Sequence, residues 1–393
     1  MEIDYIKGPK TSKIFGMSRY ENEIHKRIKN VDFNVIEYKS LTHAFEKKYK
    51  SLVPPKNNHS HSNLKSNKTT SNNIINSLIN TGKNITNDID RYRYANLVKN
   101  KIKEDNVKHI TYQDLAYLLN SVKLKKSILT CHDLIPWAYE KNRSSFWKNN
   151  LIGLKKADKI ITVSEFSKNE IIKYAKYPKD KISVIPNAVD HSIYYKNPNK
   201  DILNKLNIGE NEQIILYVGS EEPRQKVDIL IKSFAKLKKK LPKIKLIKIG
   251  DSNLYGAREK LLKLIEDLNL KKDVIFIGYV PDDELPEWYN AADLFVYPCA
   301  YAGFGLPPLE AMACGTPIIT SNTTSLPEVM GNAGIMINPN NIEDLSENMY
   351  EILTNGSLRE DLISKGLKRA KMFNWDESAE KTFEVYNELD ELI

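Results

Sequence analysis

A short stretch in the second half of the chain combines glycine, proline and a carboxylate in an order that suits anion binding. It reads Gly303-Phe304-Gly305-Leu306-Pro307-Pro308-Leu309-Glu310. Gly303 and Gly305 permit close backbone approach, and the two prolines suit a first helical turn, where no backbone N–H is needed. We therefore expect a loop that enters a helix N-terminus, a natural anion site. Glu310 is placed to accept hydrogen bonds from vicinal hydroxyls such as those of a ribose, although it can also serve only the helix dipole.

A second glycine turn, from Gly219 to Lys226, carries two cations and follows an apolar run. Arg224 can meet a diphosphate through two parallel N–H bonds, and Lys226 can add a point charge. The spacing is not that of a Walker loop, which requires Gly-x-x-x-x-Gly-Lys. A solvated basic turn is the alternative interpretation of this segment.

The first half of the chain contributes two further candidates, His132 and Gly16. His132 follows the apolar run Ile128–Cys131, and Gly16 opens the segment Gly16–Tyr20 in the first connection between a strand and a helix. Ligands of open parallel sheets bind beyond the carboxyl ends of the strands. We therefore expect both residues to face a ligand, although a lone histidine in this place can also be structural.

Both halves of the chain alternate apolar runs with helical patterns, which predicts parallel sheets covered by helices. The expected strands are Ile3–Ile6, Phe33–Ile36, Ile128–Cys131, Ile160–Val163, Ile182–Ile185, Ile214–Val218, Leu246–Ile249, Val274–Ile277, Leu294–Tyr297, Ile318–Thr320 and Ile335–Ile337. The expected helices are Glu165–Tyr174, capped by Ser164, and Val227–Lys240, Glu259–Leu268, Leu309–Cys314, Ile342–Leu353, Arg359–Met372 and Asp376–Leu392. The fold class is therefore α/β, with two doubly wound Rossmann-like domains and a ligand cleft between them.

A chain of 393 residues is too long for one ordinary core. We expect an N-terminal domain over residues 1–195, a C-terminal domain over 206–375 and a final amphipathic helix over 376–393. A polar, asparagine-rich surface insertion is expected at about 54–90, and His191–Glu210 is expected to link the domains.

Charge divides the chain in the same way. The net charge is +9, but residues 1–200 carry +18 and residues 201–393 carry −9. Three cysteines cannot build a disulfide framework, which favours a reducing compartment. No apolar run approaches the roughly 18 residues of a membrane-spanning helix. These features argue against a secreted, disulfide-stapled or membrane-spanning protein and favour a cytoplasmic one.

Together these segments resemble a family-4 (group 1) glycosyltransferase of the GT-B fold, over nearly the whole chain. The string at 303–310 is the most specific part of the resemblance. The other matching segments are Gly16–Tyr20, His132–Pro136, Val163–Ser167, Ile185–Asp190, Tyr217–Lys226, Gly278–Pro281 and Ser325–Val329. The resemblance implies a retaining hexosyltransferase that moves a sugar from a nucleotide-diphosphate donor to a glycan or lipid-linked acceptor, without a metal or other cofactor. It also implies that the last helix packs back on the first domain.

The resemblance gives particular residues a role. Glu310 is expected to hold the donor ribose and backbone groups at Val280 the base. Arg224 and a nearby lysine, Lys226, are expected to neutralise the diphosphate, and His132 to contact the transferred sugar. The remaining donor contacts are expected at Gly16, Gly219, Gly303, Phe304, Gly305 and Leu306.

Three positions depart from the family pattern. Ala302 stands where a glutamate is usual, eight residues before Glu310. Gln225 stands where the phosphate-binding lysine is usual, with Lys226 one place later, and Ala188 replaces a glycine. These departures keep open a second hypothesis, a catalytically weak or inactive sugar-nucleotide-binding protein of the same fold.

Other classes of function are less well supported. An epimerase on this architecture needs additional acid/base carboxylates, which the sequence does not supply. A nucleic-acid partner is not predicted, because the basic residues are scattered without interleaved aromatics. Asp88-Ile89-Asp90 has the form of the metal-binding tripeptide of the other glycosyltransferase fold, but it does not follow a buried strand. His59 and His61 lack nearby partner ligands, so no metal is predicted.

The basic excess of the first half exceeds what a nucleotide on the acidic half requires. Since the resemblance places the acceptor on the first domain, a phosphate-bearing lipid carrier or the anionic inner face of a membrane is an expected partner. The expected contributors are Lys99, Lys101, Lys103, Lys123, Lys125 and Lys126. The alternative is a compositional bias that fills solvated faces with lysine.

Overall fold

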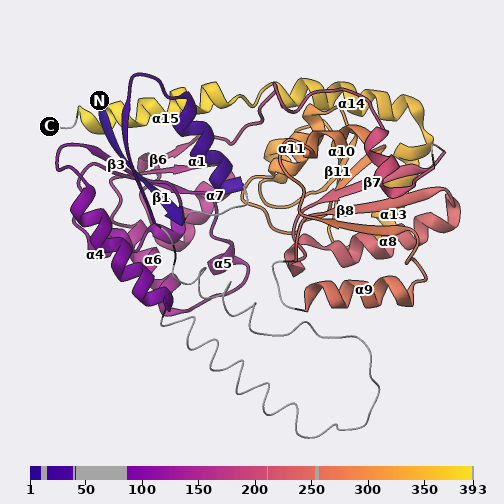
Figure 1. Ribbon diagram of the computed structural model, residues 1–393, viewed down its shortest axis with the longest axis horizontal. Helices are drawn as coiled ribbons and strands as arrows, with labels where there is room; N and C mark the ends of the chain where they lie inside the picture. The colour runs from indigo at the N-terminus through magenta and orange to yellow at the C-terminus, as the bar shows by residue number, and fades with distance from the viewer. Residues whose placement is uncertain (10–15, 39, 41–85, 210, 253–255, 392–393) are drawn as a thin grey trace, which may run out of the picture.

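The computed structural model describes residues 1–9, 16–38, 40, 86–209, 211–252 and 256–391. Two α/β domains lie side by side, each built on a six-stranded parallel sheet (Figure 1). The strand orders are β2-β1-β3-β4-β5-β6 and β12-β11-β10-β7-β8-β9. Each order reverses once, between β1 and β3 and between β7 and β10, and ligands of such sheets bind at this switch point. The predicted fold class is confirmed.

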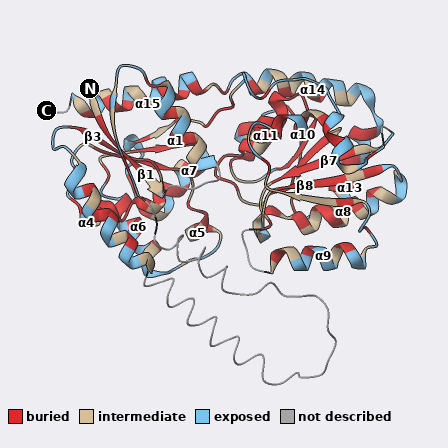
Figure 2. Ribbon diagram, viewed as in Figure 1, coloured by how far each residue is buried: buried red, intermediate tan, exposed pale blue. Residues whose placement is uncertain are grey.

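The first sheet consists of β1 (Glu2–Pro9), β2 (Asp32–Tyr38), β3 (Val107–Ile110), β4 (Ser127–Cys131), β5 (Lys159–Thr162) and β6 (Ile182–Val184). The second consists of β7 (Gln213–Val218), β8 (Ile244–Ile249), β9 (Val274–Gly278), β10 (Leu294–Tyr297), β11 (Ile318–Ser321) and β12 (Ile335–Ile337). Most of these strands are apolar on successive residues because helices cover both faces of each sheet. Buried residues accordingly line both sheets in Figure 2.

Strand β3 is absent from the sequence prediction because two polar residues interrupt its apolar pattern. Lys108 is nonetheless 1% exposed, and its amine donates to the backbone oxygen of Asn106 at 2.6 Å. His109 is fully buried, with Nδ1 2.6 Å from the hydroxyl of Tyr386 and Nε2 2.7 Å from that of Thr130. Hydrogen bonding therefore compensates the burial of polar groups in a central strand.

Among the described residues, the first domain contains the helices α1 (Gly16–Arg27), α4 (Leu118–Ser121), α5 (Ile135–Ala138), α6 (Ser145–Leu154) and α7 (Glu165–Glu170), with a further helix at 86–101. Those of the second are α8 (Val227–Lys240), α9 (Ala257–Asp267), α10 (Leu285–Ala291), α11 (Leu306–Ala313), α12 (Leu326–Met330), α13 (Ile342–Thr354) and α14 (Gly356–Ala370), followed by α15 (Trp375–Asp390). Among the described residues, no helix is long and apolar enough to span a bilayer.

Several expected helices begin or end a few residues away from these bounds, and two sequence expectations differ in the kind of structure. Residues 86–90, the described end of the expected insertion, already belong to the helix that continues to residue 101; the rest of the insertion lies outside the described residues, and so do His59 and His61. The helix expected at Glu165–Tyr174 is α only to Glu170 and continues as a π turn to Ala175. Its predicted cap is present, because the Ser164 hydroxyl accepts from the N–H of Ser167 at 3.1 Å.

The last helix, α15, follows the second domain in sequence but packs against α1 and β3 of the first (Figure 1). Tyr386 reaches His109 from this helix, and Lys126 pairs with Asp390 at 3.1 Å. The chain therefore crosses between the domains twice.

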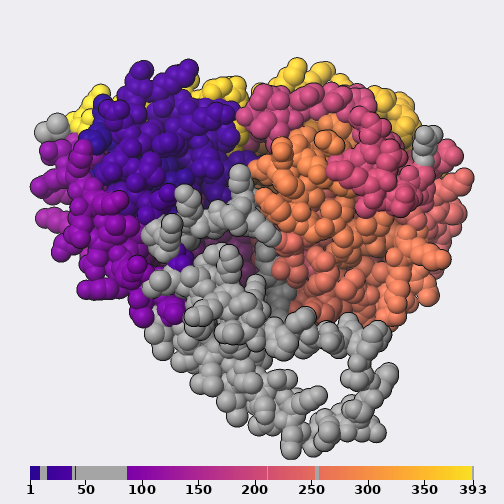
Figure 3. Space-filling view, viewed as in Figure 1, coloured from indigo at the N-terminus to yellow at the C-terminus, as the bar shows by residue number. Residues whose placement is uncertain are grey.

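Loops of the two domains also contact each other directly at the carboxyl ends of their strands. The carboxylate of Glu328 accepts from the N–H groups of Glu165 and Phe166, at 2.8 and 2.7 Å, and so caps α7 from the other domain. Tyr301 donates to the carboxylate of Glu170. In Figure 3 the indigo and orange segments meet near the centre of the molecule.

Candidate functional site

A cavity of about 330 Å³ lies where the two domains face each other, beside the carboxyl ends of β7, β8 and β9. Most of its lining comes from the loops that follow these strands and from the start of α11. The first domain contributes Gly16 and Arg19, both from α1. The second contributes Val218, Gly219, Ser220, Arg224, Gln225, Ile249, Gly250, Asp251, Tyr279, Val280, Asp282, Leu285, Leu306, Pro307 and Glu310.

Glu310 is the most firmly held side chain of this cavity. It is the fifth residue of α11, and only 4% of its side chain is exposed. The Tyr289 hydroxyl donates to Oε2 at 2.8 Å, and Arg19 donates from Nη1 to Oε1. Burial, and then the charge of Glu310, raise the pKa of Tyr289 well above its ordinary value, so its hydroxyl remains a donor. The carboxylate faces the cavity and lies beyond the first helical turn, which disfavours a role limited to the helix dipole.

Arg19 binds two carboxylates of the opposite domain. Its Nη2 lies 2.7 Å from Oδ1 of Asp282, while Nη1 contacts Glu310. Burial lowers the pKa of Arg19, but Glu310 and Asp282 more than offset this effect and raise it above the ordinary value. The sequence patterns alone give no individual role to Arg19, Asp282 or Tyr289. A partial signal exists for Arg19, which follows Gly16 by about one helical turn and therefore lies on the same face of α1.

Arg224 also lines the cavity and belongs to the short 3-10 turn Pro223–Gln225 that follows β7. It donates to the backbone oxygen of Tyr301 at 3.1 Å and pairs with Glu222 at 2.6 Å. Its buried Nε has no hydrogen-bond partner among the described residues. A guanidinium with an unused donor can accept an anionic ligand.

The two residues after Arg224, Gln225 and Lys226, differ from the sequence expectation in which of them lines the cavity. Gln225 lines the cavity, and its Oε1 accepts from the Tyr217 hydroxyl at 3.1 Å. Lys226 adopts a left-handed conformation (φ 54°) and is not one of the described residues that line the cavity. The structure therefore brings Glu310, Arg224, Gly16, Gly219, Val280 and Leu306 to one cavity, but not Lys226.

The glycine loop before α11 is pinned by contacts with the first domain. A Cβ on Gly303 would lie 2.5 Å from the backbone oxygen of His132, so only glycine fits there. The hydroxyl of Ser164 donates to the carbonyl of Gly303 at 2.8 Å, and that of Ser325 to the carbonyl of Phe304 at 2.8 Å. Gly305 has φ +119°, and no side chain among the described residues caps the helix that follows. Pro307 and Pro308 carry no N–H, and the N–H of Leu309 bonds to the carbonyl of Gly305, so Leu306 is the residue of the first turn of α11 whose N–H can meet an anion.

Of this loop, only Leu306 and Pro307 line the cavity itself; Gly303, Phe304 and Gly305 lie behind it. Phe304 is 6% exposed and packs edge-on against Phe373, with 5.8 Å between ring centroids. Of the four donor contacts expected in this loop, Gly303, Phe304, Gly305 and Leu306, the structure therefore places only Leu306 in the cavity lining.

His132 is buried behind the Gly303 loop and does not line the cavity. Its Nε2 donates to the backbone oxygen of Thr111 at 3.2 Å, and its ring packs edge-on against Tyr20. Burial lowers the pKa of His132 to about 4, so the imidazole is neutral at pH 7. A structural role, which the sequence analysis kept as the alternative, is therefore consistent with this position.

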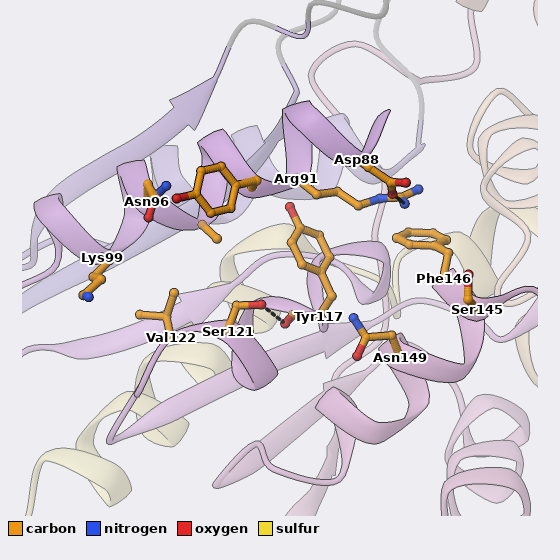
Figure 4. A pocket seen from close by; sticks show the side chains of 12 residues that line it. Asp88, Arg91, Asn96, Lys99, Tyr117, Ser121, Val122, Ser145, Phe146 and Asn149 are labelled. Carbon is orange, nitrogen blue, oxygen red and sulfur yellow. Dashed lines mark hydrogen bonds and ion pairs between the residues drawn. The ribbon is translucent and has the colours of Figure 1, made fainter. Parts of the chain in front are cut away.

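A second cavity, of about 470 Å³, lies on the first domain between the helix at 86–101, α4 and α6 (Figure 4). Aromatic rings of Tyr92, Tyr117 and Phe146 line it. Arg91 stacks over Phe146 at 4.0 Å and donates to Asp88 at 2.6 Å. The first aspartate of the Asp-x-Asp tripeptide is therefore engaged by an arginine.

The second aspartate of that tripeptide, Asp90, is 4% exposed and accepts from the hydroxyl of Ser40 at 2.8 Å. Among the residues that the structure describes, no group of three or more His, Cys, Asp and Glu side chains could hold a metal ion.

The six lysines expected to meet an anionic surface fall into two groups. Three are engaged by carboxylates: Lys103 by Glu2, Lys125 by Glu104 and Lys126 by Asp390. The other three, Lys99, Lys101 and Lys123, are exposed and form no ion pair with a described residue; Lys103 and Lys125 are exposed too, with 60% and 61% of their side chains accessible.

Two Rossmann-like domains that face each other across such a cavity form the GT-B arrangement of glycosyltransferases. Residues 198–369 match the family described as glycosyl transferases group 1, and residues 82–193 match glycosyltransferase family 4. The chain is 34% identical, over 276 residues, to the O-antigen chain mannosyltransferase B of Escherichia coli. This match covers 67% of this chain and 71% of that protein. The protein is therefore a member of the group 1 (family 4) glycosyltransferases.

Two further comparisons agree with this assignment. The chain is 32% identical over 279 residues to the serotype-specific mannosyltransferase WbdA of Escherichia coli, a match that spans 67% of this chain but only 34% of that protein. The solved structure of Anabaena Alr3699/HepE in complex with UDP and glucose shares the fold, with a TM-score of 0.73 at 17% identity, over 98% of this chain and 99% of that one.

Proposed function

We propose that this glycosyltransferase moves a hexosyl unit from a nucleoside-diphosphate sugar to a glycan or lipid-linked acceptor, with retention of the anomeric configuration. The observation that carries the proposal is one cavity that joins a buried carboxylate, Glu310, with the guanidinium of Arg224 and the N-terminus of α11 at Leu306. A ribose and a diphosphate require these groups, a carboxylate for the vicinal hydroxyls and cationic or N–H donors for the phosphates.

In this proposal the donor lies along the second domain. Glu310 accepts from the ribose hydroxyls, and the backbone at Val280, after β9, meets the base. The diphosphate lies toward Arg224 and the α11 N-terminus. Gly16 lies against Leu306 across the cleft, and a Cβ at residue 16 would be 3.3 Å from a methyl carbon of Leu306. Because glycine has no side chain, the first domain can approach the donor at this point.

The chemistry requires stabilisation of a leaving group. When the bond between the sugar C1 and the phosphate oxygen breaks, negative charge develops on the diphosphate. Arg224 and the α11 N-terminus are fixed in place before the reaction, and such preorganised groups usually provide the largest electrostatic contribution. The acceptor hydroxyl forms the new bond to C1 and gives its proton to the departing phosphate oxygen. Because attack and departure use the same face of the sugar, configuration is retained.

The first donor to test is a nucleoside-diphosphate mannose, since both of the relatives compared above are described as mannosyltransferases. The experiment incubates the protein with a panel of UDP-, GDP- and ADP-sugars and an oligosaccharide ending in mannose. Proton NMR of the product then reports the anomeric configuration. Retention supports the proposed mechanism, whereas inversion contradicts it.

A second candidate is a protein that binds sugar nucleotides without turnover. It is favoured by Gln225, which occupies the cavity where a lysine is usual, and by Ala302, which supplies no carboxylate. Calorimetric binding of a nucleoside diphosphate, together with no product from any donor of the panel, would identify this alternative.

We also propose that the protein works in the cytoplasm, with its acceptor presented at the inner face of a membrane. The charge of +18 on residues 1–200 supports this placement. The exposed lysines Lys99, Lys101 and Lys123 are the groups that an anionic surface would meet, because their neighbours Lys103, Lys125 and Lys126 are already paired.

A further inference from the structure

Among the residues that the structure describes, Arg19 is the one side chain of α1 that pairs with two carboxylates of the facing domain in the lining of the donor cavity, those of Asp282 and Glu310. It lies three residues after Gly16, and 16% of its side chain is exposed. Nη2 meets Asp282, which follows β9, and Nη1 meets Glu310 on α11. The guanidinium therefore forks between two elements of the second domain that line the same cavity.

Glu310 needs this cation because it is almost completely buried. A buried carboxylate without compensation is strongly unfavourable, and a hydroxyl donor such as Tyr289 compensates it only in part. The residue that supplies the charge stands 291 positions away in the chain and belongs to the other domain. The charge compensation of Glu310 consequently depends on the approach of the two domains.

The contacts also fix the orientation of the carboxylate. Two oxygens offer about four acceptor sites. Among the described residues, Tyr289 uses one site on Oε2, Arg19 uses one on Oε1 and no other hydrogen bond to this carboxylate is found, so one site on each oxygen remains for a ligand. Two remaining sites on two oxygens match a pair of vicinal hydroxyls.

We propose that Arg19 is a positioning residue that orients Glu310 toward the donor ribose and makes ribose recognition depend on closure of the domains. This inference rests on the proposed function, because it assumes that Glu310 meets a ribose. Arg19 acts through Glu310, and Asp282 holds the other end of its fork so that the guanidinium cannot rotate away.

The inference predicts a change in selectivity that a merely stabilising ion pair would not produce. An oriented carboxylate discriminates against a nucleotide that lacks the 2′-hydroxyl, because one acceptor site is then left unpaired. Without Arg19 the carboxylate can turn or recruit water, and most of this discrimination is lost.

The experiment measures dissociation constants by calorimetry for GDP, UDP and ADP, each beside its 2′-deoxy counterpart. For the nucleotides that bind, the wild-type protein should prefer the ribose form by about tenfold, the equivalent of one well-made hydrogen bond. Arg19→Met should reduce this preference to less than about twofold, mainly by weakening the ribose form. Arg19→Lys, which keeps the charge but cannot fork between two carboxylates, should give an intermediate preference.

Arg27→Met is the matched control, because Arg27 lies on the same helix and also bridges carboxylates. It pairs with Asp190 and with Asp376, both at 3.1 Å, but does not line the donor cavity. This variant should lose thermal stability and keep the wild-type preference for ribose.

Four results would overturn the inference. A folded Arg19→Met protein with an unchanged preference would show that Arg19 is only an ion-pair partner. If Arg19→Met does not fold, an unchanged preference for the ribose form in Arg19→Lys would likewise show that Arg19 is only an ion-pair partner. If Glu310→Gln removes the preference while both Arg19 variants retain it, the proposed function stands and only the role of Arg19 falls. If no nucleotide binds to the wild-type protein, the proposed function fails as well.

Discussion

The hydroxyl of Tyr289 lies 2.8 Å from Oε2 of Glu310, and both side chains are buried between α10 and α11. The ring of Tyr289 is in turn held by Phe295, with 5.4 Å between centroids. The carboxylate expected to bind the donor ribose thus rests on a phenol that the core of the second domain fixes in place. Its position is set before any ligand arrives, which lowers the ordering cost of binding.

Tyr289→Phe keeps the ring packing but removes this hydrogen bond. We expect the dissociation constant of the bound nucleoside diphosphate to rise about tenfold, since a hydrogen bond to a charged group contributes roughly 1.5 kcal/mol. Tyr386→Phe is the matched control, because it removes a buried hydroxyl 2.6 Å from His109 in the first domain, remote from the cavity. Calorimetry on both variants checks the prediction, and equal weakening of nucleotide binding would contradict it.

His132→Ala should affect turnover more than nucleotide affinity. His132 lies behind the Gly303 loop and contacts the first-domain residues Thr111 and Tyr20, not the nucleotide cavity. A contribution made only in the transition state lowers kcat and leaves the ground-state affinity nearly unchanged. The contact of His132 with the transferred sugar, which the family resemblance implies, stays a proposal. On that proposal we expect kcat to fall by about 100-fold, while the nucleotide dissociation constant changes by less than about threefold. Parallel losses in both quantities would assign His132 to structure alone.

Two buried histidines should make the protein sensitive to mild acid. Burial lowers the pKa of His132 to about 4 and that of His109 to about 3, below the ordinary value of 6.5. The unfolded chain therefore binds more protons than the native one below pH 6.5. The contribution to stability is complete above that pH and is lost as the pH falls toward 4, by up to about 1.4 kcal/mol per pH unit for each histidine.

Urea unfolding at pH 7 and pH 5 measures this loss. The wild-type protein should lose more unfolding free energy between these values than His132→Asn, which has no group to protonate at this site. Identical losses in the two proteins would show that His132 does not contribute to the pH dependence.

Vesicle binding should depend on the exposed lysines. Lys99, Lys101 and Lys123 are exposed, and each can contribute about 1 kcal/mol near an anionic bilayer, screened over about 8 Å at physiological salt. Their replacement by glutamine should reduce co-sedimentation with anionic vesicles more than replacement of the paired residues Lys103, Lys125 and Lys126. Binding should fall as salt rises. Equal recovery with neutral and anionic vesicles at low salt would refute a membrane role.

Local patterns predict most of the fold because buried parallel strands are apolar along their whole length. All eleven expected runs are strands in the structure, two with the expected bounds and nine with changed ends. Strand β3 does not follow the apolar pattern, because Lys108 and His109 are buried through specific hydrogen bonds. The start of the helix at 86–101 could not be predicted from the apolar pattern either. Its first turn continues a polar, asparagine-rich segment, while its buried face of Tyr94, Ala95 and Val98 begins only later.

The candidate site could be predicted where backbone geometry dictates residue type. Gly303 and Gly305 are required by close approach and by a positive φ, and Glu310 and Arg224 follow from their spacing to such turns. The pairing of Arg19 with Glu310 and Asp282 could not be predicted, because it depends on how two separately folded domains meet. Lys226 was placed beside Arg224 by sequence proximity, yet the left-handed turn at that residue leaves it outside the cavity lining.

We propose that sugar transfer occurs from a nucleoside-diphosphate donor held at this cavity. Nucleotide release from the donor panel, in the presence of mannose-ended oligosaccharide, tests this proposal when it is compared between the wild-type protein, Glu310→Gln and Arg224→Met. We expect acceptor-dependent release from at least one donor by the wild-type protein. We also expect a loss of at least about 100-fold in Arg224→Met, as for removal of one preorganised group at a developing charge. Release that is equal in all three proteins, or absent in the wild-type protein with every donor, would refute the proposal.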